Sequence, residues 1–196
     1  TILEAPTGEG KTEAGLTLAR RIAALRGTDE LYIALPTTAT TNARHTRIHE
    51  HLSQRLGLPK SLVRLVHGQD FLQEDDLPTK PLDNGDGEHP PSLDWFAPKK
   101  KALLAPFGVG TVDQAELSAL NVRYNGLRMI GLAGKVVILD EVHAYDTYMT
   151  HIIKRMLAWL APLGTSVILL SATLPLERRR ELAQAYAPNV KFELTE

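Results

Sequence analysis

The chain has 196 residues, of which 43% are hydrophobic and 23% are charged, and its formal net charge is −1. This size and composition suit one globular α/β domain, and no apolar run approaches the roughly 20 residues of a membrane-spanning helix. The absence of cysteine excludes disulfide bonds and thiolate metal sites and fits a reducing cytoplasm, while the near-zero charge argues against a polybasic surface but still permits a nucleic-acid track of backbone amides and hydroxyls.

A strand, a glycine-containing loop and a helix are predicted at the start of the chain. The stretch Thr1–Glu4 is β-prone, and apolar residues recur at a helical spacing from Glu13 to Leu25, after which Gly27 ends the helix. The loop between them consists of Ala5, Pro6, Thr7, Gly8, Glu9, Gly10, Lys11 and Thr12. Because glycines let successive N–H groups point inward and a helix N-terminus carries partial positive charge, this order of elements predicts a phosphate cradle.

The same loop carries the side chains that nucleotide binding requires. We expect Lys11 to reach the β- and γ-phosphates of ATP and the Thr12 hydroxyl to ligate Mg²⁺. The general motif opens with Gly, whereas this chain has Ala5 at that position. A tight β-to-α turn without a ligand is therefore the alternative, and a second site further along the chain has to decide between the two.

A second buried strand is predicted over Leu31–Leu35, a continuous apolar run of the kind found in parallel sheets. A hydroxyl-rich turn follows at 36–42, and a helix is expected from about Thr40 to Leu56. Thr37 and Thr38 either cap this helix or grip a nucleic-acid phosphate at its N-terminus. The local sequence favours neither interpretation over the other.

The middle of the chain changes character. Leu62–Val66 is predicted to form a further strand, whereas His67–Lys101 is an acidic, turn-rich insertion without sustained periodicity. Three adjacent carboxylates lie in this insertion at 74–76, and we interpret them as a solvated charge run because neighbouring carboxylates do not point at a common centre. A metal site there is the less favoured alternative.

A strand-like stretch is predicted to begin at Ala102 and to lead into a short helix. Gly110–Thr111 predicts a tight turn, and a helix is expected over about Asp113–Leu120, capped by its first residue. Nothing in the local pattern requires Gln114 beside that cap. A second short helix is expected near 127–132.

The second anchor of the predicted site is an acidic strand end. Val136–Leu139 predicts a buried parallel strand, and Asp140 and Glu141 follow at the end where ligands bind in open α/β sheets. Burying two carboxylates without compensation is costly, so a cation is expected nearby. We predict that Asp140 shares Mg²⁺ with Thr12, usually through water, and that Glu141 orients or deprotonates the water that attacks the γ-phosphate. A helix cap is the alternative for this pair of acids.

Two helices and a strand complete the predicted order of elements. Asp146 is predicted to cap a helix that extends to about Leu160. A buried strand over Ser166–Leu170 then leads into the segment Ser171–Pro175, and a final helix is expected over about Leu176–Ala187.

Taken in order, five of these segments resemble the motifs of the first motor domain of superfamily 2 helicases. They are Ala5–Thr12, Pro36–Thr38, Gly110–Gln114, Asp140–His143 and Ser171–Thr173. Within that superfamily, Leu103–Gln114 and Asp140–Asp146 most resemble the CRISPR-associated helicase-nucleases of type I systems. The resemblance implies an α/β fold of the RecA-like P-loop type, with a mainly parallel sheet and helices on both faces.

The resemblance also implies an activity and a set of partners. A motor of this kind travels 3′ to 5′ along single-stranded DNA using ATP and Mg²⁺, after recruitment by an RNA-guided CRISPR surveillance complex. The residues that it places along the DNA strand are Thr37, Thr38, Gly110, Thr111 and Gln114. The residues that it assigns to catalysis are Lys11, Asp140 and Glu141, and those that couple hydrolysis to movement are His143, Ser171 and Thr173.

The resemblance covers one motor domain, and we expect residues 1–196 to be its N-terminal RecA-like part alone. None of the seven histidines is followed by aspartate, so a nuclease domain is expected to be absent, and the chain ends soon after Ser171–Thr173, so a second motor domain is expected to be absent too. That domain ordinarily supplies arginine fingers, worth about 10³–10⁵ in rate in related phosphoryl-transfer systems. The isolated piece is therefore expected to bind ATP weakly, to hydrolyse it poorly and not to unwind DNA.

Two other functions stay open on the sequence. One is a different superfamily 2 DNA or RNA helicase or translocase, against which Pro36–Thr38 and Val112–Gln114 argue. The other is a nucleotide-dependent scaffold that binds a protein partner through the insertion at 67–101 and never turns over. The salt dependence of single-stranded DNA binding separates a DNA motor from such a scaffold.

Overall fold

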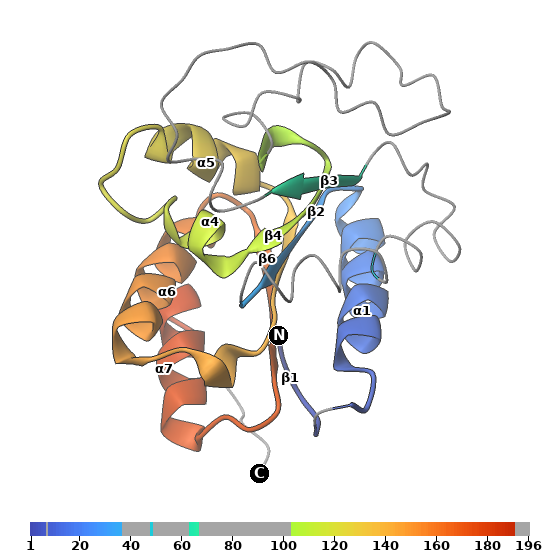
Figure 1. Ribbon diagram of the computed structural model, residues 1–196, viewed down its shortest axis with the longest axis vertical. Coiled ribbons are helices and arrows are strands. Elements are labelled where there is room, and N and C mark those ends of the chain that lie inside the picture. Colours follow the sequence, from blue (N-terminus) through green and yellow to red (C-terminus); the bar gives the residue numbers. More distant parts are fainter. Residues whose placement is uncertain (7, 37–47, 49–62, 67–102, 191–196) are drawn as a thin grey trace.

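The computed structural model describes residues 1–6, 8–36, 48, 63–66 and 103–190. Within these ranges, six strands form one sheet in the order β1-β6-β5-β2-β4-β3, and every neighbouring pair is parallel (Figure 1). The strands are β1 (Ile2–Glu4), β2 (Leu31–Leu35), β3 (Val63–Val66), β4 (Phe107–Thr111), β5 (Val136–Leu139) and β6 (Ser166–Ser171). The predicted parallel sheet is confirmed.

Helices cover both faces of this sheet. Figure 1 shows α1 on one side and α6 and α7 on the other. The described helices are α1 (Lys11–Arg26), α4 (Val112–Glu116), α5 (Asn125–Leu132), the 3₁₀ turn η4 (Val142–Ala144), α6 (Thr147–Leu160) and α7 (Leu176–Tyr186). The predicted α/β architecture of the RecA-like type is therefore confirmed. Within the described ranges, no helix combines the length and the apolarity needed to span a bilayer.

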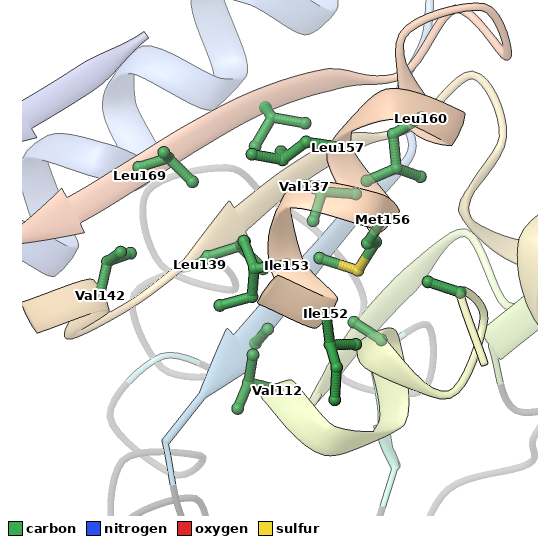
Figure 2. Packing of buried hydrophobic residues seen from close by; sticks show 14 of the residues in the cluster. Val112, Val137, Leu139, Val142, Ile152, Ile153, Met156, Leu157, Leu160 and Leu169 are labelled. Carbon is green, nitrogen blue, oxygen red and sulfur yellow. The ribbon is translucent and has the colours of Figure 1, made fainter. Parts of the chain in front are cut away.

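The alternation of side chains along the strands divides the core into two clusters. The odd-numbered residues of β2 pack with Leu16 and Ala19 of α1. The even-numbered residues of β2 belong to the opposite cluster, in which Val137 and Leu139 of β5 pack with Ile153 of α6 (Figure 2). Both faces of the central strands are thus buried, which explains why their sequences are continuously apolar.

Several predicted boundaries agree with the structure. Helix α1 ends at Gly27, whose φ of 66° is left-handed. Asp146 caps α6, because its Oδ1 accepts a hydrogen bond of 2.8 Å from the backbone N–H of Met149. Leu25 departs from the apolar pattern of α1, since it is 88% exposed.

Two predicted segments lie outside the described residues. They are the helix at 40–56, of which only the buried helical residue Ile48 is described, and the insertion at 67–101.

The segment around β4 differs from its prediction in three ways. The strand begins at Phe107, later than predicted, while Ala102 lies outside the described residues. The predicted turn at Gly110–Thr111 is wrong, because these are the last two residues of β4. The helix that follows ends at Glu116 instead of near Leu120, and its N-cap is Thr111 instead of the predicted Asp113.

Packing against β2 explains why a glycine occurs at position 108 of β4. A Cβ atom on Gly108 would lie 2.8 Å from Cδ2 of Tyr32, so the tyrosine ring takes the space that a side chain would need. The hydroxyl of Tyr32 then donates a hydrogen bond of 3.2 Å to the carbonyl of Thr111. After α4 the backbone hydrogen bonds change to a spacing of three residues, as in the bond from the N–H of Ser118 to the carbonyl of Ala115. This change ends the α-helix early.

Two glycines of α5 provide a matched test of close packing. A Cβ atom on Gly131 would lie 2.9 Å from the carbonyl oxygen of Leu103, whereas a Cβ atom on Gly126 would meet no atom within 4 Å. We expect Gly131→Ala to lower the free energy of unfolding by about 1–3 kcal/mol because a backbone atom has to move. Gly126→Ala should raise it by up to about 1 kcal/mol. Urea unfolding of both variants tests this, and equal midpoints would contradict the packing described.

Candidate active site

The loop between β1 and α1 has the backbone that a phosphate cradle needs. Gly8 and Gly10 have φ angles of 92° and 76°, in the left-handed region that glycine adopts without strain. Gly10 is the N-cap of α1 and, as a glycine, supplies no side-chain cap to the first turn of that helix. Thr7 lies outside the described residues.

Lys11 lies inside this loop. The residue is 7% exposed, and its Nζ donates hydrogen bonds of 2.6 Å to the carbonyl of Ala5 and 3.0 Å to that of Pro6. These two carbonyls directly follow β1, so the lysine joins the start of the loop to the start of α1. The ammonium group is thereby held inside the loop, next to the backbone of its first two residues.

The acidic end of β5 is a tight turn held by its own side chains. Asp140 is 1% exposed, and its Oδ1 accepts a hydrogen bond of 2.9 Å from the N–H of Glu141. The hydroxyl of Tyr145 donates a hydrogen bond of 2.6 Å to the carbonyl of Asp140. Glu141 has φ 58° and ψ 41°, a left-handed conformation that costs a residue other than glycine about 1–2 kcal/mol. The surrounding contacts maintain this strained geometry at the residue that we predicted to act on water.

The loop and the acidic turn meet. Thr12 Oγ1 donates a hydrogen bond of 3.3 Å to Asp140 Oδ2, across 128 positions of sequence. Helix α1 packs against β5 and β6, and its first turn carries Thr12. The two groups that the sequence proposes as Mg²⁺ ligands therefore lie side by side.

His143 connects the acidic turn to the end of β6. Its Nδ1 accepts a hydrogen bond of 3.2 Å from the N–H of Ala172 and lies 3.4 Å from Ser171 Oγ. In the neutral ring the proton is therefore on Nε2, which lies 3.4 Å from Oε2 of Glu141. Ser171 Oγ in turn donates to the carbonyl of Thr173 at 3.0 Å. The three residues predicted to couple hydrolysis to movement thus form one contact chain that ends at Glu141.

The residues assigned by resemblance to the DNA strand lie elsewhere. Gly110, Thr111 and Gln114 are together at the junction of β4 and α4, but the last two are only 1% and 2% exposed. Thr111 Oγ1 and Gln114 Oε1 have no hydrogen-bond partner among the described residues. Thr37 and Thr38 lie outside those residues. The structure therefore groups three of the five candidates below the surface.

One buried acid near this junction was not singled out from the sequence. Glu116 is 4% exposed, and its burial raises its pKa to about 7, with further increases from the charges of Asp113 and Asp146. The spacing of Asp113 and Glu116, three residues apart on one helix, was the available signal because like charges at that spacing repel. The burial itself depends on packing between α4 and α6.

The raised pKa predicts a stability that falls as pH rises. In the unfolded chain the pKa of Glu116 is near 4.5, so between about pH 4.5 and pH 7 the folded state keeps a proton that the unfolded state has lost. Glu116→Gln removes this proton uptake, and it should change the unfolding free energy little at pH 4 but raise it by on the order of 1–3 kcal/mol at pH 8. Chemical unfolding at both pH values measures the difference. Asp113→Asn should move the fall to lower pH, and an unchanged pH profile in Glu116→Gln would contradict the assignment.

Comparison with known proteins places this site in a family context. No family model matches the chain. It is 42% identical over 194 residues to the CRISPR-associated endonuclease/helicase Cas3 of Thermus thermophilus, covering 95% of this chain and 21% of that protein. The Cas3 of Escherichia coli K12 is 37% identical over 191 residues, with the same two shares. The chain is homologous to one segment of the Cas3 helicase-nucleases.

Solved Cas3 structures agree with this assignment. The crystal structure of T. fusca Cas3 with ADP superposes with a TM-score of 0.80 at 40% identity, covering 94% of this chain and 20% of that one. A CRISPR RNA-guided surveillance complex in a pre-nicking state contains a chain with a TM-score of 0.68 at 33% identity, which covers 100% of this chain and 18% of that one. The chain thus spans about a fifth of the length of the Cas3 proteins that it matches. The resemblance to the CRISPR-associated helicase-nucleases is confirmed.

Proposed function

We propose that this chain is the ATP-binding half of a 3′–5′ single-stranded DNA translocase that acts in CRISPR interference. One observation carries the proposal, namely the 3.3 Å approach of Thr12 Oγ1 to Asp140 Oδ2 at the mouth of a glycine loop. The names of the Cas3 relatives as helicases support it, as do the T. fusca Cas3 structures with ADP, AMPPNP and ATP. We further propose that residues 1–196 form the N-terminal RecA-like motor domain of such a protein.

The residues present fit a magnesium ion bound together with a nucleotide. Thr12 and Asp140 would hold the ion, because their oxygen atoms lie 3.3 Å apart and oxygen atoms are the ligands that Mg²⁺ prefers. Among the described residues, no group of three histidine, aspartate or glutamate side chains comes together as a metal site. The remaining ligands would therefore be phosphate oxygens and water, the set that Mg²⁺ ordinarily keeps at nucleotide sites. When bound, the ion would neutralise charge on the phosphates.

The side chains around this position take distinct parts. The N–H groups of the loop and the ammonium of Lys11 bind the β- and γ-phosphates. Glu141 orients or deprotonates the attacking water, and the Nε2–H of His143, 3.4 Å away, holds its carboxylate in place. Ser171 and Thr173, on the other side of His143, transmit changes at this carboxylate towards the surface.

The partners are proposed on the same basis. A structure of a CRISPR RNA-guided surveillance complex contains a chain 33% identical to this one, which supports recruitment of this chain by such a complex. We propose that the DNA strand is bound through Thr37, Thr38, Gly110, Thr111 and Gln114. The burial of Thr111 and Gln114 implies that DNA binding is accompanied by a rearrangement at the β4–α4 junction.

Single-stranded DNA binding at varied salt tests the proposal against a scaffold function. Between about 50 and 200 mM salt, a plot of the logarithm of the binding constant against the logarithm of the salt concentration should have a slope of about −0.7 per phosphate neutralised, because counterions are released. Fluorescence anisotropy of a labelled oligonucleotide measures this slope. An oligonucleotide with uncharged methylphosphonate linkages is the control and should not bind. Binding of MgATP without any binding of DNA would support the scaffold instead.

A further inference from the structure

A ring of polar contacts lies at the end of β1, directly before the phosphate loop. Glu4 is the last residue of β1, and its Oε1 accepts a hydrogen bond of 3.1 Å from the N–H of Leu174. Its Oε2 forms an ion pair of 2.7 Å with Nη2 of Arg179, in α7. Arg179 closes the ring, because its Nε donates a hydrogen bond of 2.8 Å to the carbonyl of Leu174.

The ring joins two parts of the candidate site. On one side of it Ala5 begins the loop, and the N–H of Ala5 donates to the carbonyl of Ser171 at 3.2 Å. On the other side, Leu174 follows the segment whose Ala172 N–H holds His143. Oε1 of this carboxylate accepts a hydrogen bond and Oε2 forms an ion pair with a guanidinium, and a contact between ionised groups is stronger than a neutral hydrogen bond.

The contacts of Glu4 matter for the position of the phosphate loop, because β1 has few other attachments to the sheet. β1 has three residues, lies at the edge of the sheet and, among the described strands, pairs only with β6. The loop that follows it is thus attached to the sheet through a short ladder on one side. The ion pair is also partly shielded, since the side chains of Arg179 and Glu4 are 23% and 26% exposed, and such pairs are screened less than fully exposed ones.

We propose that Glu4 and Arg179 are positioning residues that fix the phosphate loop relative to the segment Ser171–Leu174 and so set the affinity for nucleotide. This inference rests on the proposed function, because it assigns the ring a part in binding ATP. A second ion pair of α7 offers a matched control. Lys154 and Glu181 pair at 3.2 Å between α6 and α7, with side chains 35% and 54% exposed, and this pair does not involve β1.

Titration of MgATP against the protein and its variants tests the inference. Glu4→Gln should raise the dissociation constant roughly tenfold, because the amide loses the charge-assisted tie to Arg179. Adding Arg179→Met to Glu4→Gln should cause little further loss, as expected for two residues of one interaction. Arg179→Lys should give an intermediate value, since it keeps the charge but loses the Nε donor. Glu181→Gln should bind as the wild type does.

The outcomes separate this inference from the function on which it rests. If the wild type binds no MgATP, the proposed function fails and the inference with it. If the wild type binds and Glu4→Gln binds equally well, the inference alone is overturned, and a loss in Glu181→Gln equal to that in Glu4→Gln overturns it too. Thermal unfolding of each nucleotide-free variant confirms folding, and Arg179→Lys provides the test if Glu4→Gln does not fold.

Discussion

Lys11→Ala is expected to abolish the binding of MgATP, with a dissociation constant raised by about 100-fold or more. The ammonium group lies within the loop and is the cation placed to meet the β- and γ-phosphates. Charge-assisted contacts of this kind contribute about 1.5–3 kcal/mol each, and losing more than one of them reaches a factor of 100. Isothermal titration of MgATP measures the loss.

The control for this variant has to separate nucleotide binding from folding. Lys11 also donates to the carbonyls of Ala5 and Pro6, so its replacement removes two contacts within the loop. Arg21→Ala removes one positive charge from an exposed position of the same helix and should leave affinity unchanged. Circular dichroism of both variants checks that α1 is retained. Lys11→Ala that is folded and binds MgATP like the wild type would show that the loop is only a structural turn.

Glu141→Gln is expected to leave nucleotide binding intact and to lower hydrolysis by about 10²–10⁴-fold, the usual contribution of a general base. The amide has nearly the same shape as the carboxylate, so it can stay within reach of Nε2 of His143, but it cannot accept a proton from water. The experiment requires a protein with measurable turnover that contains this chain, and release of phosphate at saturating MgATP gives the rate. The affinity for MgATP is measured alongside.

Two comparisons make the result for Glu141 specific. Glu177→Gln changes an exposed carboxylate in the first turn of α7 and should hydrolyse ATP at the wild-type rate. A Glu141→Gln variant that keeps both binding and hydrolysis would mean that another group acts on the water. Loss of binding together with hydrolysis would instead assign Glu141 a part in holding the nucleotide.

Much of the fold could be predicted because burial dictates the sequence of a parallel strand. β2 and β5 are buried on both faces, and their continuous apolar runs marked them with the right boundaries to within a residue. The end of β4 was predicted wrongly because Gly110 was interpreted as a turn residue, whereas it lies within the strand. Gly108 of the same strand makes room for the ring of Tyr32, a requirement that comes from a neighbouring strand and leaves no local signal.

The parts of the candidate site that could be predicted are those in which a charged group requires a group of opposite charge nearby. The buried Asp140 required a cation, and the Lys11–Thr12 pair required an acidic group, so each anticipated the other. The supporting contacts were not predictable, because they involve backbone groups. The tie from Tyr145 to the carbonyl of Asp140 and that from Ala172 to His143 depend on where the chain returns in space, which residue types alone do not encode.

Because β1 lies at the edge of the described sheet, the two halves of the site differ in their stability against local opening. β5, which carries the acids, has a neighbour on each side, so it can separate only if the whole sheet opens. β1, which carries the phosphate loop, pairs among the described strands with β6 alone, and outside that ladder it is held by the contacts of Glu4 with Leu174 and Arg179. The acidic half of the site should therefore resist local opening more than the phosphate loop does. A bound triphosphate that contacts both halves would stabilise the loop side most.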